Sequence, residues 1–140
     1  VLVGFIVFGV SLFFYPTFNV VNPFLTLCVL FLTAILFSLM GFINAVFADS
    51  FDDISIIPTF VLTPLIYLGG VFYSINILPE FWKNISLGNP MLYVVNIFRE
   101  GMIGISDVSI PFSLFMIVMF IFILTISCLY LLNKGTGIRQ

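Results

Sequence analysis

Long apolar runs alternate with short polar breaks along the whole chain. The breaks contain proline, glycine, asparagine or charged residues, and the runs between them are rich in Phe, Ile, Leu and Val. A helix needs about 20 apolar residues to cross the roughly 30 Å hydrocarbon core of a bilayer. Three runs meet this length, so the pattern predicts three complete transmembrane helices. They are residues 24–46, 54–75 and 111–132.

The first 15 residues form a shorter apolar run. As a helix they would extend about 22 Å, which is less than the thickness of the hydrocarbon core. The chain starts at Val1 without a basic flank, so this run does not have the pattern of a signal peptide. We therefore expect residues 1–15 to be the end of a span that starts upstream, in a chain that is truncated at its N-terminus.

Small residues form a stripe along the predicted span 24–46. We expect this helix to start at Asn22-Pro23, because asparagine caps free N–H groups and proline fits the first helical position. The stripe residues follow the spacing i, i+4, i+7 and i+11, so they would let another helix approach closely in lipid. The alternative is that they are ordinary small residues of a span. They are Ala34, Ser38, Gly41 and Ala45.

Two prolines and a glycine pair interrupt the predicted span 54–75. Proline removes a hydrogen-bond donor inside a helix, so the span should be kinked. Carbonyl groups that are freed inside a bilayer must be satisfied by protein, hydroxyl groups or water, so we expect this span to face protein or a cavity. The residues of the kink and of a candidate substrate path are Pro58, Thr59, Thr63, Pro64, Gly69 and Gly70.

Residues 79–104 combine apolar positions with one polar helix face. Asn89-Pro90 predicts a helix that continues to about Ile103, and a helix of about 21 Å is too short to cross a bilayer. The segment should therefore lie at the interface, or enter the membrane and return under a cover of protein. Arg99 and Glu100 form either a charged element of a gate or an interfacial pair. The polar face consists of Asn89, Tyr93, Asn96 and Glu100.

Composition supports a membrane protein and excludes several function classes. The chain is 62% hydrophobic and 7% charged, whereas soluble domains are roughly one quarter charged. Four Lys and Arg residues cannot form a nucleic-acid-binding surface. The chain has no histidine, P-loop or Cys-x-x-Cys motif, so we expect no enzymatic activity, cofactor or metal site within it. The predicted fold is an all-α, polytopic helix bundle with a short re-entrant or interfacial segment.

Five short motifs lie between residues 51 and 90. They are Phe51–Leu65, Tyr67–Ser74, Leu78-Pro79, Phe81-Trp82 and Asn89-Pro90. They combine a P-x(5)-P spacing with a glycine pair and two short proline motifs. Together they closely resemble the C-terminal half of type-2 ABC transporter permeases, especially bacterial inner-membrane exporters, and the resemblance covers essentially all of the chain.

The resemblance implies a six-span inner-membrane subunit with both termini in the cytoplasm. Two such subunits would pair with two copies of a separate ATPase, which would hold the ATP and Mg. Residues 133–140 would form a cytoplasmic tail, and residues 79–104 would form external re-entrant helices. The candidate ATPase contacts are Asp49, Asp52 and Asp53, of which the last two are alternatively helix caps. The candidate external gate consists of Asn89, Pro90, Tyr93, Asn96, Arg99 and Glu100.

The resulting functional hypothesis is a permease subunit of an ABC export system, which forms the substrate path and is driven by the separate ATPase. One alternative is a structural or assembly protein of the membrane without a solute path. A secondary transporter or channel subunit is another alternative, although the predicted spans lack the ionisable residues that ion-coupled transport usually uses. A structural role predicts that the span 54–75 is fully packed and dry.

Overall fold

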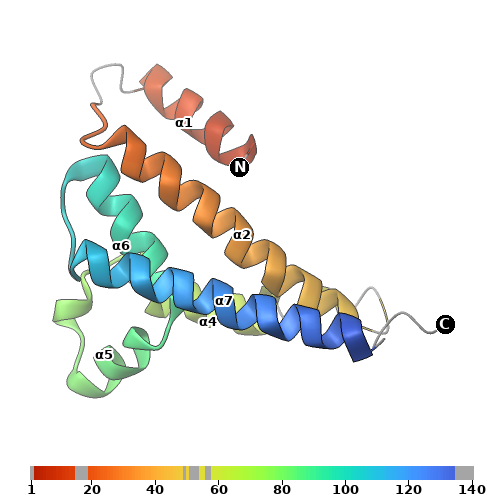
Figure 1. Ribbon diagram of the computed structural model, residues 1–140. Helices are drawn as coiled ribbons and strands as arrows, with labels where there is room; N and C mark the ends of the chain where they lie inside the picture. The colour runs from red at the N-terminus through yellow and green to blue at the C-terminus, as the bar shows by residue number, and fades with distance from the viewer. Residues whose placement is uncertain (1, 15–18, 49, 51–53, 56–57, 135–140) are drawn as a thin grey trace.

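The computed structural model describes residues 2–14, 19–48, 50, 54–55 and 58–134, and these residues contain helices and no strands. The prediction of an all-α membrane protein is confirmed. Figure 1 shows the helices in chain order. The elements are α1 (Leu2–Phe14), α2 (Pro23–Phe47), η1 (Pro58–Leu62), α4 (Thr63–Leu68), η2 (Ile75–Ile77), α5 (Glu80–Leu87), α6 (Pro90–Ile103) and α7 (Ile110–Lys134).

Two helices, α2 and α7, are long and apolar enough to cross a membrane. Each has 25 residues, which corresponds to about 37 Å. The Asn22 side chain accepts a hydrogen bond from Leu25 N at 3.1 Å and caps α2, with Pro23 in the first turn. Both helices run in the same direction in Figure 1, and their C-terminal parts contact each other where Cys128 Sγ lies 3.7 Å from Leu39 O.

Helix α6 packs against the N-terminal parts of both long helices (Figure 1). It approaches α2 closely at Gly101, because a Cβ atom there would lie 2.4 Å from Thr26 Oγ1. The backbone N–H of Asn22 donates to Gly101 O at 2.8 Å across the same contact. Half of the buried hydrophobic core comes from α6. That core consists of Val29, Leu36, Ile75, Leu92, Tyr93, Val94, Ile97 and Ile117.

Helix α1 lies beside the N-terminal part of α2 and has no buried residues (Figure 1). It contacts α2 at Gly4, where an added Cβ atom would lie 3.1 Å from Leu30 Cδ1. The 13 residues of α1 extend about 20 Å. That residues 1–15 are the end of a longer span stays a prediction.

The proline-containing segment differs from the single kinked span that we predicted over 54–75. Among its described residues, Ile54 and Ser55 are helical, η1 is a π-helix, and α4 ends at Leu68. Gly69 ends α4 and Gly70 follows with a left-handed φ of 74°. The glycine pair therefore ends the helix, whereas we had predicted a kinked span that continues to residue 75.

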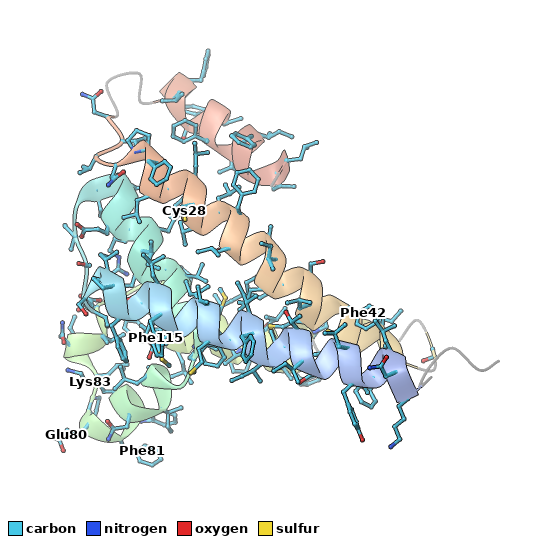
Figure 2. All side chains as sticks on the ribbon, viewed as in Figure 1. Cys28, Phe42, Glu80, Phe81, Lys83 and Phe115 are labelled. Carbon is cyan, nitrogen blue, oxygen red and sulfur yellow. The ribbon has the colours of Figure 1, made fainter. Side chains whose placement is uncertain are left out.

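Helix α5 is short and lies at the edge of the molecule. Figure 2 shows Glu80, Phe81 and Lys83 at this outer edge. Phe81 and Trp82 are exposed and their rings pack edge to face, with centroids 5.4 Å apart. Lys83 Nζ donates a hydrogen bond to Asn76 Oδ1 at 3.1 Å. This amphipathic helix therefore presents aromatic rings and charges on the outside of the bundle.

Candidate functional site

The turn after α4 meets α6 and the loop before α7 in a cluster of polar groups. Gly70 starts the turn, because its positive φ lets the chain reverse without a Cβ atom in the way. Ser74 caps η2 by accepting a hydrogen bond from Asn76 N at 3.3 Å. The turn therefore brings a backbone carbonyl and a hydroxyl group to the side of α6.

An ion pair joins α6 to the loop before α7. Arg99 Nη1 lies 3.0 Å from Asp107 Oδ2, and the two side chains are 20% and 11% exposed. Arg99 Nη2 also donates a hydrogen bond to Gly70 O. The charged partner of Arg99 is thus Asp107, and not the neighbouring Glu100 with which we had grouped it. Glu100 is partly exposed and takes part in none of these hydrogen bonds.

Asp107 connects both segments because each carboxylate oxygen accepts from the turn. The Ser74 hydroxyl donates to Asp107 Oδ1 at 2.6 Å, and Ile75 N donates to Asp107 Oδ2 at 3.3 Å. Charge-assisted hydrogen bonds of this kind are stronger than neutral ones. We call Gly70, Ser74, Arg99 and Asp107 the polar clamp.

Asn96 holds the loop that carries Asp107. Its side-chain oxygen accepts from Asp107 N at 2.7 Å and from Val108 N at 3.1 Å. Its Nδ2 group donates to Val108 O at 2.7 Å and to Ser113 Oγ at 3.1 Å. Since Asn96 is only 2% exposed, the amide is buried with a full set of partners, as buried polar groups require.

The start of α6 is tied to α4 through Asn89. Its side-chain oxygen accepts from Met91 N at 2.9 Å and caps α6, with Pro90 in the first turn. Its Nδ2 group donates to Leu65 O at 2.6 Å, so it satisfies a carbonyl near the end of α4. Tyr93 OH donates to Leu87 O at the end of α5. The polar positions 89, 93 and 96 are therefore buried in protein, whereas a helix on a membrane surface would turn them to water.

The predicted kink residues occupy two different environments. Pro58, Thr59, Thr63 and Pro64 lie on the exposed surface of the described chain. Gly69 and Gly70 are buried. A Cβ atom on Gly69 would lie 2.9 Å from Met91 Cβ, so this glycine permits the close contact between α4 and α6.

Most of the predicted helix-packing stripe is exposed. Ala34 is half-buried, whereas Ser38, Gly41 and Ala45 are exposed. Nothing lies within 4 Å of a Cβ atom added at Gly41. The prediction that the stripe receives another helix therefore stays untested. The predicted ATPase contacts Asp49, Asp52 and Asp53 lie outside the described residues.

A cavity of about 630 Å³ lies between α1, α2 and α6. Its walls are largely apolar and include Leu30, Phe37 and Phe98, and Arg99 is the one charged residue among the described residues that line it. Apolar walls with a few polar groups are typical of sites for small molecules. The guanidinium that closes the polar clamp therefore also borders a space that could receive an apolar or amphipathic molecule.

Several residues of this site escaped sequence reasoning. Asp107 lies between the predicted helix that ends at about Ile103 and the predicted span 111–132. It is an acid eight residues after Arg99, and this proximity in the sequence could have indicated an ion pair. Ser74, Ser113 and Thr26 gave no signal, because their roles depend on contacts between distant segments. In the described residues no group of three His, Cys, Asp or Glu side chains could hold a metal ion.

Comparisons with known proteins agree on one family. Residues 1–103 match the ABC-2 type transporter family. The chain is 49% identical over 138 residues to the inner membrane transport permease YadH of Escherichia coli (strain K12), which covers 99% of this chain and 54% of that protein. It is 26% identical over 76 residues to nodulation protein J of Rhizobium leguminosarum bv. viciae, which covers 54% of this chain and 29% of that protein. No solved structure matches the chain significantly.

Proposed function

The chain belongs to the ABC-2 type transporter family, and we propose that it forms part of the permease subunit of an ATP-driven export system in the bacterial inner membrane. It spans about half the length of the curated relative YadH. The activity proposed here is therefore that of the longer permease. The observation that carries the proposal is the 49% identity to YadH across 99% of this chain.

The architecture supports a role in forming the substrate path. The structure contains two helices that are long enough to cross the membrane. Beside them lie a proline-containing segment and the short helix α6, which has 14 residues. Such broken and short helices usually line a cavity or contact protein in membrane proteins, because their free backbone groups need polar partners. In the proposed permease, residues 58–103 border the path, and residues 79–103 do so at the external side.

The proposed partners supply the energy and complete the path. ATP and Mg would be bound by a separate ATPase subunit, and this chain would respond to its closure through cytoplasmic segments. A second permease copy would face the first, as is general in the family. The apolar cavity beside Arg99 suits an apolar or amphipathic cargo.

The structural alternative makes a different prediction for the proline-containing segment. A membrane protein without a solute path should bury this segment completely in the full-length protein. Pro58, Thr59, Thr63 and Pro64 are exposed in the described chain, which covers about half the length of YadH. These residues are therefore available for contact with the rest of the permease or with the substrate path.

Purification and ATPase measurements on the full-length protein test the proposal. The full-length permease, extracted from its native membrane with a mild detergent, should co-purify with an ATPase subunit. Reconstituted together in liposomes, the two should hydrolyse ATP in a vanadate-sensitive way and faster than the ATPase alone. A stable full-length preparation that recruits no ATPase would contradict the proposal.

A further inference from the structure

The polar clamp joins three segments that are distant in the sequence. Arg99 comes from α6, Gly70 and Ser74 come from the turn after α4, and Asp107 comes from the loop before α7. We propose that Arg99 and Asp107 are positioning residues that make α4 and α6 move as one unit when the permease changes state. This inference rests on the proposed function, because it concerns movement that an ATPase drives.

Two separate attachments tie α6 to α4 and its turn. Asn89 Nδ2 bonds Leu65 O at the start of α6, and Arg99 Nη2 bonds Gly70 O near its end. Asn89 and Arg99 are ten positions apart, which is about 15 Å along a helix. One attachment alone would leave α6 free to rotate about it. Two attachments at this separation fix the direction of α6 relative to α4.

The flexible point of this unit lies before α4. Element η1 has π-helical hydrogen bonding. It begins at Pro58 and ends two residues before Pro64. Helices bend at prolines and at π-helical turns, because the regular hydrogen bonding is interrupted there. Bending at η1 would therefore carry α4, and the clamp would transmit this movement to α6.

An ion pair suits this role better than packing alone. A partly buried ion pair contributes little net stability, because both charges lose water, but it strongly disfavours arrangements in which one charge is left alone. The guanidinium also bonds its two acceptors through separate N–H groups, which fixes its orientation. Since Arg99 borders the 630 Å³ cavity, movement of the unit changes the shape of that cavity.

Hydrogen exchange on the full-length permease with its ATPase measures this coupling directly. Exchange of peptides from residues 58–68 and 90–103 is compared between the nucleotide-free and the vanadate-trapped complex in lipid nanodiscs. In the parent protein we expect the exchange rates of both peptides to change on trapping, by about threefold or more. A parent complex in which only one of the two peptides responds would overturn the inference.

Asp107→Asn removes the charge but keeps the size of the side chain. The neutral amide cannot form the ion pair, although its oxygen can still accept a hydrogen bond from Arg99. We expect trapping in this variant still to change peptide 58–68, while the change in peptide 90–103 disappears. Asp107→Glu keeps the charge and should restore that change. If Asp107→Asn loosens α6 equally in both states and leaves the trapping-dependent change intact, the pair is merely structural and the inference is wrong.

Two further variants separate this result from misfolding and from a general charge effect. Arg99→Lys keeps the charge but lacks the planar fork that reaches Asp107 and Gly70 through separate N–H groups. It should therefore weaken the response of peptide 90–103 even if Asp107→Asn fails to assemble. Glu80→Gln removes an acid on the outer edge of α5 (Figure 2) and should behave like the parent. Absence of ATPase binding in the parent would contradict the proposed function itself. If the complex is trapped but only one of the two peptides changes its exchange rate, only the inference is contradicted.

Discussion

The Asn96 side chain, next to the polar clamp, depends on a donor and acceptor pattern that few residues share. The Asn96 amide accepts two hydrogen bonds and donates two, and all four partner atoms belong to residues 107, 108 and 113. Aspartate has the acceptors without the donors, and leucine has neither. Because three of the four partners are backbone groups that cannot be replaced by mutation, the residue at position 96 decides whether they are satisfied.

Asn96→Asp should therefore destabilise the full-length protein. The new carboxylate oxygen would face Val108 O, and the two oxygens repel each other. Val108 O also loses the hydrogen bond that the Asn96 amide donates. We expect a loss of about 1–3 kcal/mol for the unsatisfied buried group, measured by thermal unfolding in detergent. Ser113→Ala is the matched control, since it removes one hydrogen bond and should cost about 1 kcal/mol. An Asn96→Asp variant as stable as Ser113→Ala would contradict the role given to this amide.

Gly101 and Gly41 provide a second comparison at the level of single residues. Alanine is favoured over glycine by roughly 1 kcal/mol in a helix, so both substitutions start with the same gain. At Gly101 the new Cβ atom would lie 2.4 Å from Thr26 Oγ1, whereas nothing lies within 4 Å at Gly41. We expect Gly101→Ala to lower the thermal stability of the full-length protein. If Gly41→Ala lowers it equally, another helix occupies the small-residue stripe.

The helical elements show which parts of the fold local sequence can predict. Asn22-Pro23 and Asn89-Pro90 mark the first turns of α2 and α6, because capping depends only on neighbouring residues. The end of α4 at Leu68 could not be predicted from neighbouring residues. A glycine pair either loosens a helix or ends it, and the choice here depends on the contact between Gly69 and Met91, which are 22 positions apart.

The environment of the polar face of α6 was also beyond local reasoning. The spacing of Asn89, Tyr93 and Asn96 shows that one side of the helix differs from the other. Which side is buried depends on whether the rest of the chain offers partners. Those partners are Leu65, Leu87 and the loop at Val108, and none of them lies on α6. The candidate gate residues could thus be selected from the sequence, whereas their contacts could not.

Helix α5 should lie at the membrane–water interface. Trp82 is half-exposed beside Phe81, and aromatic rings favour the headgroup region. We expect lipids brominated near the headgroup to quench its fluorescence more strongly than lipids brominated near the chain end. The signal is the difference between the full-length protein and its Trp82→Phe variant. Stronger quenching by the deep label would place α5 inside the hydrocarbon core and contradict the prediction.

The orientation of the whole molecule in the membrane can be tested from α5 and α6. In the proposed topology, residues 79–104 face the exterior. Lys83→Cys, in a variant without Cys28 and Cys128, should react with a membrane-impermeant thiol reagent added outside intact cells. Asn89→Cys should react slowly, because Asn89 is 3% exposed. Labelling of Lys83→Cys only after the cytoplasmic side is opened would reverse the orientation.

The amide of Asn96 also constrains how the protein is made. All its partners are synthesised after it, between Asp107 and Ser113. While the ribosome adds these residues, α6 carries an unpaired amide that is costly in lipid. We therefore expect helix α6 to stay in a watery or chaperoned environment until the start of α7 has emerged. We also expect α6 and the start of α7 to enter their final positions together.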